Sequence, residues 1–142
     1  MKNLNVLLLL VFATQCSTVK QGIEGNLIWV EGNQMPGPDR KPTTPQGVAR
    51  EVHIYPLLSM NDVTLEGVFV SEVNKPLFKK IQSNQKGKFM VNLPPGDYSI
   101  LIKEDDGLFV NTFDGQNHLN PITVTTNQVT RVDIRINYKA AY

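Results

Sequence analysis

Residues 83–104, SNQKGKFMVNLPPGDYSILIKE, decide the fold class of this chain. Apolar and polar side chains alternate over residues 88–93 and again over 97–103, which is the period of a strand with one buried face. Between these runs, Pro94-Pro95-Gly96 places fixed φ angles before a residue that tolerates positive φ, so a tight reversal is favoured. The sequence at 84–87, NQKG, supplies a similar reversal at the other end. We therefore expect three strands in an antiparallel meander.

The rest of the chain also has the pattern of a β protein, with no convincing helical period after the N-terminal segment. Alternation between turn signals predicts further strands at residues 23–31, 48–55, 77–82, 108–112, 122–125 and 129–138. Residues 63–70 fit either a strand or an irregular crossover. Asp105-Asp106-Gly107 predicts a hairpin turn, and residues 126–128 predict the turn of a final hairpin.

About seven short strands with turn signals between them predict an all-β fold, a Greek-key sandwich of two sheets. We expect its core to be built by the larger inward-facing side chains. These are Trp29, Val52, Ile54, Ile81, Phe89, Val91, Leu93, Tyr98, Ile100, Ile102, Ile134 and Ile136.

Two long connections interrupt this pattern and hold the candidate binding residues. Residues 32–47 contain four prolines and three glycines, which predicts an exposed loop without helix or paired strand, and residues 113–121 form a second polar loop. Both combine amide and carboxylate groups with an embedded apolar side chain, a mixture typical of recognition surfaces on a rigid sandwich. The candidates are Asn33, Met35, Phe113, Asp114, Asn117 and His118. The alternative is that both loops are solvated connections.

Several motifs together resemble a known family. SNQKGKF at residues 83–89 and LPPGDY at 93–98 are similar to the signature of carboxypeptidase regulatory-like domains, the transthyretin-like (prealbumin-like) β-sandwiches of Bacteroidetes envelope proteins. GIEG at residues 22–25 resembles the family's first strand, and VHIY at 52–55 its second. The resemblance implies one domain over residues 22–142 and no peptidase activity, with the two long loops as insertions.

The N-terminal segment predicts export from the cytoplasm. Lys2 precedes an apolar run over residues 4–13, which is too short to span a bilayer as a helix but suits a secretory signal, so we assign residues 1–15 to a signal peptide. Cys16, the sole cysteine, follows directly, at the position where a bacterial lipoprotein carries the lipidated thiol, and residues 16–21 form a tether.

A lipid on Cys16 would make the membrane itself a partner of this chain. The alternative is cleavage after Ala13 by the ordinary signal peptidase, which leaves a free thiol; Gln15 stands where lipoproteins usually have a small residue. The residues after Cys16 lack the acidic run that resembles a surface-export signal. We therefore expect an outer-membrane lipoprotein that faces the periplasm.

Composition and motifs argue against several function classes. The net charge of +1 without a Lys/Arg cluster argues against nucleic acid as a partner. The chain has no Gly-x-Ser-x-Gly elbow and only two histidines, so we expect no catalytic residue, no metal site and no cofactor. Glu104, Asp105, Asp106 and Asp114 offer enough oxygen atoms for a calcium site, but their spacing matches no calcium loop.

The sequence thus predicts a non-catalytic, lipid-anchored envelope protein whose β-sandwich is an interaction or structural module. Its partner would be another envelope protein or a glycan. The alternative is a small-ligand or carbohydrate-binding module, although Trp29, the only tryptophan, is expected in the core rather than on an exposed sugar platform.

Overall fold

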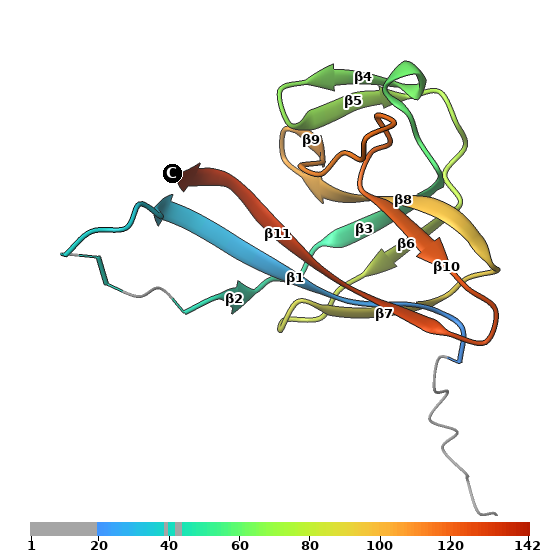
Figure 1. Ribbon diagram of the computed structural model, residues 1–142, viewed down its shortest axis with the longest axis horizontal. Helices are drawn as coiled ribbons and strands as arrows, with labels where there is room; N and C mark the ends of the chain where they lie inside the picture. Colours follow the sequence, from blue (N-terminus) through green and yellow to red (C-terminus); the bar gives the residue numbers. More distant parts are fainter. Residues whose placement is uncertain (1–19, 39, 42–43) are drawn as a thin grey trace, which may run out of the picture.

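The computed structural model describes residues 20–38, 40–41 and 44–142, which form a sandwich of two β-sheets (Figure 1). The signal peptide predicted at residues 1–15 and the candidate lipidation site Cys16 lie outside the described residues. The strands are β1 (Gly22–Asn33), β2 (Gln46–Gly47), β3 (Glu51–Pro56), β4 (Val63–Glu66), β5 (Phe69–Val73), β6 (Lys79–Gln82), β7 (Lys88–Asn92), β8 (Gly96–Glu104), β9 (Gly107–Phe109), β10 (Pro121–Val124) and β11 (Val129–Ala141).

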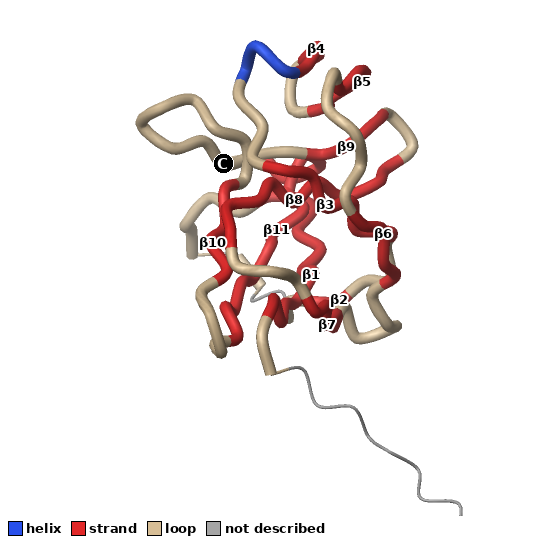
Figure 2. The backbone as a smooth tube through the Cα atoms, turned by 90° about the vertical axis from the view of Figure 1, so that its right-hand side faces the viewer, coloured by secondary structure: helices blue, strands red, loops and turns tan. Residues whose placement is uncertain are grey.

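The prediction of an all-β, two-sheet sandwich is confirmed, although the described residues contain eleven strands rather than about seven. A 3-10 turn, η1 (Met60–Asp62), precedes β4, and Figure 2 shows η1, β4 and β5 together at one end of the sandwich. No helix among the residues described is long and apolar enough to span a membrane.

β1 is the central strand of the first sheet. It pairs in parallel with β11 from Gly22, opposite Val129, to Asn33, opposite Ala141. On its other edge it pairs antiparallel with β7 and then with the short β2. The pairing of β2 corrects the expectation that residues 32–47 hold no paired strand.

The second sheet has the order β4-β5-β9-β8-β3-β6, with β10 paired to the start of β8. β8 is its central strand, and residues 98–102 are all buried, so both faces of β8 are covered. The ambiguous residues 63–70 belong to a β4–β5 hairpin that turns at Gly67, whose φ is +64°. The predicted hairpin at Asp105-Asp106-Gly107 is confirmed, since β8 pairs with β9.

The expected three-stranded meander is wrong, because its strands lie in alternate sheets. β6 and β8 belong to the second sheet and β7 to the first, so Pro94-Pro95-Gly96 carries the chain from one layer to the other. The expected final hairpin fails in the same way, with β10 and β11 in different sheets. The physical reason is that β8 is apolar on both faces and takes its neighbours from β3, β9 and β10, which leaves no edge for β7.

The main core lies between the two sheets and contains every side chain predicted for it, with Trp29 and Ile81 only partly buried at its rim. A second, smaller core lies on the outer face of the second sheet and was not predicted. Its buried residues are Tyr55, Leu58, Val70, Leu101, Val110 and Leu119. Leu119 belongs to the connection predicted as a polar loop, so that connection folds back over the sheet instead of extending into solvent.

β1 and β11 continue together beyond the sandwich (Figure 1). We call this extension, residues 30–33 and 137–141, the arm. The register of the pair shifts after Trp29 and Ile136, which marks a β-bulge at the base of the arm.

Candidate functional site

Two of the predicted site residues, Asn33 and Met35, lie at the tip of the arm. The Asn33 Oδ1 atom accepts a hydrogen bond of 2.8 Å from the Met35 amide, and the Gln34 amide donates to the Ala141 carbonyl at 2.7 Å. The amide group of Asn33 therefore shapes a local turn. Met35, with 54% of its surface exposed, is a large apolar side chain that this loop presents to solvent.

The other four predicted residues lie in the connection between β9 and β10, where Asp114 organises a closed turn. Its Oδ1 atom accepts the amides of Gln116 at 2.8 Å and His118 at 2.9 Å. Its Oδ2 atom lies 2.7 Å from His118 Nδ1. These contacts lower the pKa of Asp114, first through the hydrogen bond from the His118 amide. Asp114 and His118 therefore serve the turn, which Asn117 completes with a φ of +63°.

This connection is attached firmly to the sheet beneath it. Leu119 is fully buried, and its amide donates to the Leu58 carbonyl at 2.9 Å. The Asn120 side chain accepts the Thr112 amide at 2.9 Å and donates to the Ile100 carbonyl at 2.9 Å. These contacts hold the loop against the sheet, and such anchoring lowers the entropy cost of binding a partner.

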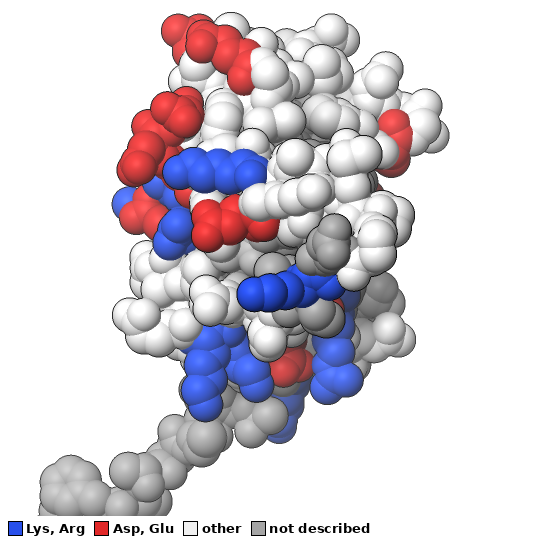
Figure 3. Space-filling model, turned by 90° about the vertical axis from the view of Figure 1, so that its left-hand side faces the viewer, with Lys and Arg blue, Asp and Glu red and all other residues white. Residues whose placement is uncertain are grey.

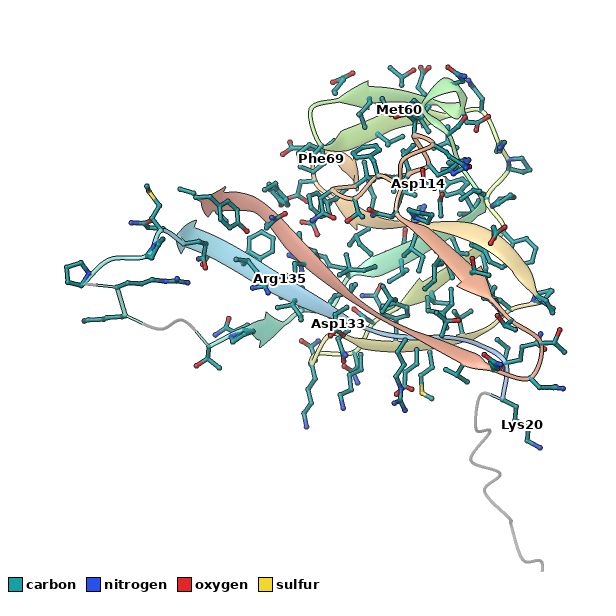
Figure 4. All side chains as sticks on the ribbon, viewed as in Figure 1. Lys20, Met60, Phe69, Asp114, Asp133 and Arg135 are labelled. Atoms are coloured by element: carbon teal, nitrogen blue, oxygen red, sulfur yellow. The ribbon has the colours of Figure 1, made fainter. Side chains whose placement is uncertain are left out.

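Two large apolar side chains are exposed beside this turn. Phe113 is 42% exposed, and Met60, which sequence reasoning missed, is 41% exposed. The Met60 amide donates to the Asn117 carbonyl at 3.2 Å, which joins η1 to the turn, and Met60 and Asp114 appear at the same end of the molecule in Figure 4. We call the surface formed by Met60, Phe113, Gln116 and Asn117 the apical surface.

The position of Met60 follows from a capping pattern that sequence reasoning could have used. Ser59 and Asp62 have the spacing of a capping box, and Asp62 Oδ2 accepts both the amide and the hydroxyl of Ser59 at 2.8 Å. The Ser59 amide, then the Ser59 hydroxyl and Lys75, lower the pKa of Asp62 to about 2. The turn that carries Met60 is therefore held by a charged cap.

The structure does not bring the two predicted loops together. The arm tip projects away from the sandwich, whereas the apical surface lies beside η1, β4 and β5 (Figure 1). The candidate residues thus belong to two separate surfaces.

On the face seen in Figure 3, acidic side chains gather in the upper part and basic ones predominate in the lower part.

A buried ionic cluster at the base of the arm was also missed by the sequence reasoning. The Glu104 side chain is only 4% exposed; its Oε1 atom accepts from Arg50 Nε at 2.8 Å and its Oε2 atom from the Tyr138 hydroxyl at 2.8 Å. Burial, followed by the hydrogen bond to Glu104, raises the pKa of Tyr138 to about 12. Both Glu104 oxygens are thus bonded within the protein, which argues against a calcium site that uses this carboxylate. Among the described residues, no three His, Cys, Asp or Glu side chains group as metal ligands would.

Aromatic rings surround this cluster and join the arm to the second sheet. The Tyr138 ring packs edge-on against Phe69 and Trp29, with centroid distances of 5.0 Å and 5.5 Å. Arg50 lies 5.6 Å from the centroid of the Trp29 ring. The cluster therefore fixes the direction in which the arm leaves the sandwich.

A cavity of about 400 Å³ lies at the base of the arm and extends towards the loop that follows it. Its lining combines one aromatic ring with charged and amide groups. The residues are Trp29, Val30, Glu31, Gln34, Arg40, Thr44, Pro45, Gln46 and Arg135. Trp29 thus packs against the core and also borders an open cavity, which corrects the expectation that it is wholly a core residue.

His53 alternates with the buried residues Val52 and Ile54 along β3, yet its own side chain is also largely buried. Its side chain is 14% exposed, and Nε2 lies 2.6 Å from Glu51 Oε1. Burial follows because β3 is an inner strand of the second sheet, with β6 and β8 on its two edges.

Comparisons of the chain with protein-family models, with curated proteins and with solved structures found no match.

Proposed function

We propose that this chain is an exported, lipid-anchored protein of the cell envelope whose β-sandwich is a non-catalytic interaction module. The partner of the module is another envelope protein, which binds at the apical surface. A lipid on Cys16 holds the protein on the periplasmic side of the outer membrane. The sandwich provides the rigidity, and the apical surface provides the specificity.

One observation carries this proposal: Phe113 is exposed on a connection that Leu119 and Asn120 anchor to the second sheet, and Met60 is exposed on η1, which is hydrogen-bonded to that connection. Exposed aromatic and methionine side chains are enriched at protein interfaces, and amides such as those of Gln116 and Asn117 form the hydrogen bonds of a polar rim. A solvated connection needs neither a buried anchor nor exposed apolar groups. The apical surface therefore has the composition and the rigidity of a binding site.

Cross-linking in intact cells followed by pull-down of the full chain tests the proposed interaction. We expect a specific envelope protein to be captured by the parent and lost when Phe113→Ala and Met60→Ala are combined. Leu77→Ala is the matched control, because Leu77 is also 41% exposed but lies before β6 and outside the apical surface. Equal capture by the parent, the double variant and Leu77→Ala would contradict the assignment of the apical surface.

Mass spectrometry of the mature protein tests the anchor separately. We expect an N-terminus at Cys16 that carries acyl chains, and recovery of the protein in the outer-membrane fraction. Cys16→Ser should release the protein into the soluble periplasmic fraction. A mature N-terminus at Thr14 without lipid would refute the lipid anchor. It would not affect the proposed interaction at the apical surface, which the cross-linking experiment tests.

The cavity beside Trp29 favours a second candidate function, the binding of a carbohydrate. Sugars are bound by an aromatic ring together with amide and charged side chains, and Trp29, Gln34, Gln46 and Arg40 line this cavity. On a glycan array we expect saturable binding that Arg40→Ala abolishes and that Lys80→Ala, a change on β6 outside the cavity, leaves unchanged. The absence of any saturable glycan would exclude this function.

A further inference from the structure

β11 is an edge strand, because β1 is the only strand with which it pairs among the described residues. The Gln128 carbonyl bonds the Gly22 amide, so the even-numbered residues of β11 turn their backbone groups towards β1. The Arg135 carbonyl instead accepts from Asn111 Nδ2, on the opposite side. The N–H and C=O groups of Arg131 and Asp133 therefore point to the open edge.

Along residues 129–136 this edge lacks three of the devices that prevent strand addition, namely proline, a bulge and an inward-pointing charge; its charged side chains point outward. Residues 129–136 contain no proline, and the bulge in the pairing begins only after Ile136. The inward-facing side chains Val132, Ile134 and Ile136 are apolar, so no inward charge opposes a new neighbour. Below the edge, a cavity of about 230 Å³ lined in part by Ile122, Val132 and Ile134 leaves space for an added side chain.

The outward-facing side chains of this sheet form two polar rows that end at β11. In the first row Glu24 lies opposite Arg131, with 3.2 Å between Glu24 Oε2 and Arg131 Nε. In the second row Asn26 lies opposite Asp133 and donates to it at 2.7 Å. Figure 4 shows Asp133 and Arg135 in sequence along β11. The open edge thus shows a cation and an anion two residues apart.

We propose that the occupant of this edge is a second copy of the chain, whose β11 pairs antiparallel with the first about a two-fold axis at Val132. In this register Arg131 lies opposite Asp133 of the second copy, and Asp133 opposite its Arg131. Each of these pairs exchanges two backbone hydrogen bonds through the groups that are free at the edge. Opposite charges directly across strands stabilise the pairing, so the edge is complementary to itself. The two first sheets become one continuous sheet.

Neighbouring registers are less favourable. A two-fold axis at Asp133 places Arg131 opposite Arg135 and Asp133 opposite itself, so like charges face each other. An axis at Ile134 pairs Asp133 with Arg135, but the Arg135 carbonyl is already bonded to Asn111. With the axis at Val132, the two central pairs, Arg131 with Asp133 and Asp133 with Arg131, satisfy both the charges and the backbone, and the Arg135 carbonyl lies outside them. This inference depends neither on the lipid anchor nor on the apical surface.

Cysteine cross-linking of the full chain in membranes tests the register. Residues 132 of the two copies face each other as a non-hydrogen-bonded pair, where Cα atoms approach to about 4.5 Å and a disulfide can form. Mild oxidation should therefore convert Val132→Cys into a disulfide-linked dimer. Thr130→Cys is the matched control: it lies on the same face of β11 but opposite residue 134 of the second copy, so it should not link to itself. Oxidation of the parent protein measures any dimer that forms through Cys16.

A dimer band for Val132→Cys that is no stronger than the bands of Thr130→Cys and the parent would overturn the proposal. The charges are tested in the Val132→Cys protein. Asp133→Lys should lower the cross-linked fraction by about threefold or more, because two attractive pairs become repulsive. Adding Arg131→Glu should restore it, and unchanged melting temperatures exclude misfolding as the cause. A cross-linked fraction that neither substitution changes would refute the register.

Discussion

At the residue scale, different side chains of the connection between β9 and β10 anchor it to the sheet and face the solvent. Leu119 is fully buried in the second core, whereas Phe113, six residues earlier, is 42% exposed. We expect Leu119→Ala to lower the free energy of unfolding by about 2–5 kcal/mol, because it leaves a cavity in a packed cluster. Phe113→Ala should change it by less than about 0.5 kcal/mol. Urea unfolding of the two variants measures both values, and equal losses would mean that Phe113 is also an anchor.

Also at the residue scale, Tyr138 links stability to alkaline pH. Its pKa in the folded protein is about 12, against 10.0 for an unperturbed tyrosine, and burial is the largest cause. A raised pKa means that the folded state holds the proton more tightly, so this contribution to stability is complete below pH 10 and is lost as the pH rises towards about 12. We expect Glu104→Gln to lower the pKa of Tyr138, yet to leave it above the unperturbed value, because burial persists.

Absorbance titration of the phenolate groups checks this expectation. Tyr138→Phe identifies the step that belongs to Tyr138 among the four tyrosines of the chain. Identical titration curves for the parent and Glu104→Gln would show that the carboxylate does not act on the hydroxyl.

At the scale of elements, β1 and the turn between β6 and β7 approach too closely for a side chain. Gly87 has a φ of +78°, and a Cβ there would lie 2.2 Å from the Leu27 carbonyl oxygen. The Leu27 amide donates to the Gly87 carbonyl at 2.8 Å, so this contact fixes the turn against β1. The glycine is needed both for its φ and for the space.

Two glycine substitutions separate these requirements. Gly67 has a φ of +64°, but a Cβ added there would have no neighbouring atom within 4 Å, so Gly67→Ala should cost only about 1 kcal/mol of backbone strain. Gly87→Ala adds a clash with backbone and should cost at least about 2 kcal/mol. The difference between the two unfolding free energies measures the close approach, and equal costs would contradict it.

At the scale of the whole molecule, the pairing of the chain ends should govern folding. β1 pairs with β11, and the Asn26–Asp133 hydrogen bond joins residues 107 positions apart. Such non-local pairing is reached late, because the loop it closes costs entropy before the contact is made. Trp29, the only tryptophan, lies on β1 beside Tyr138 of β11 and reports this step. We expect its fluorescence to reach the native value in milliseconds to seconds in stopped-flow refolding; completion within microseconds would contradict this order.

The sequence by itself determined the β class, most residues of the main core and the hairpin between β8 and β9, because alternation and turn residues act over a few neighbouring positions. It also identified Met35 and Phe113 as exposed side chains of long connections. Tertiary structure decided which sheet each strand joins, the parallel pairing of β1 with β11, and the burial of Leu119. It also gathered Arg50, Glu104 and Tyr138, which come from three distant segments. The alternation of apolar and polar residues shows that one face of a strand is buried, but it does not show which layer covers that face. The covering layer depends on packing between residues far apart in the chain.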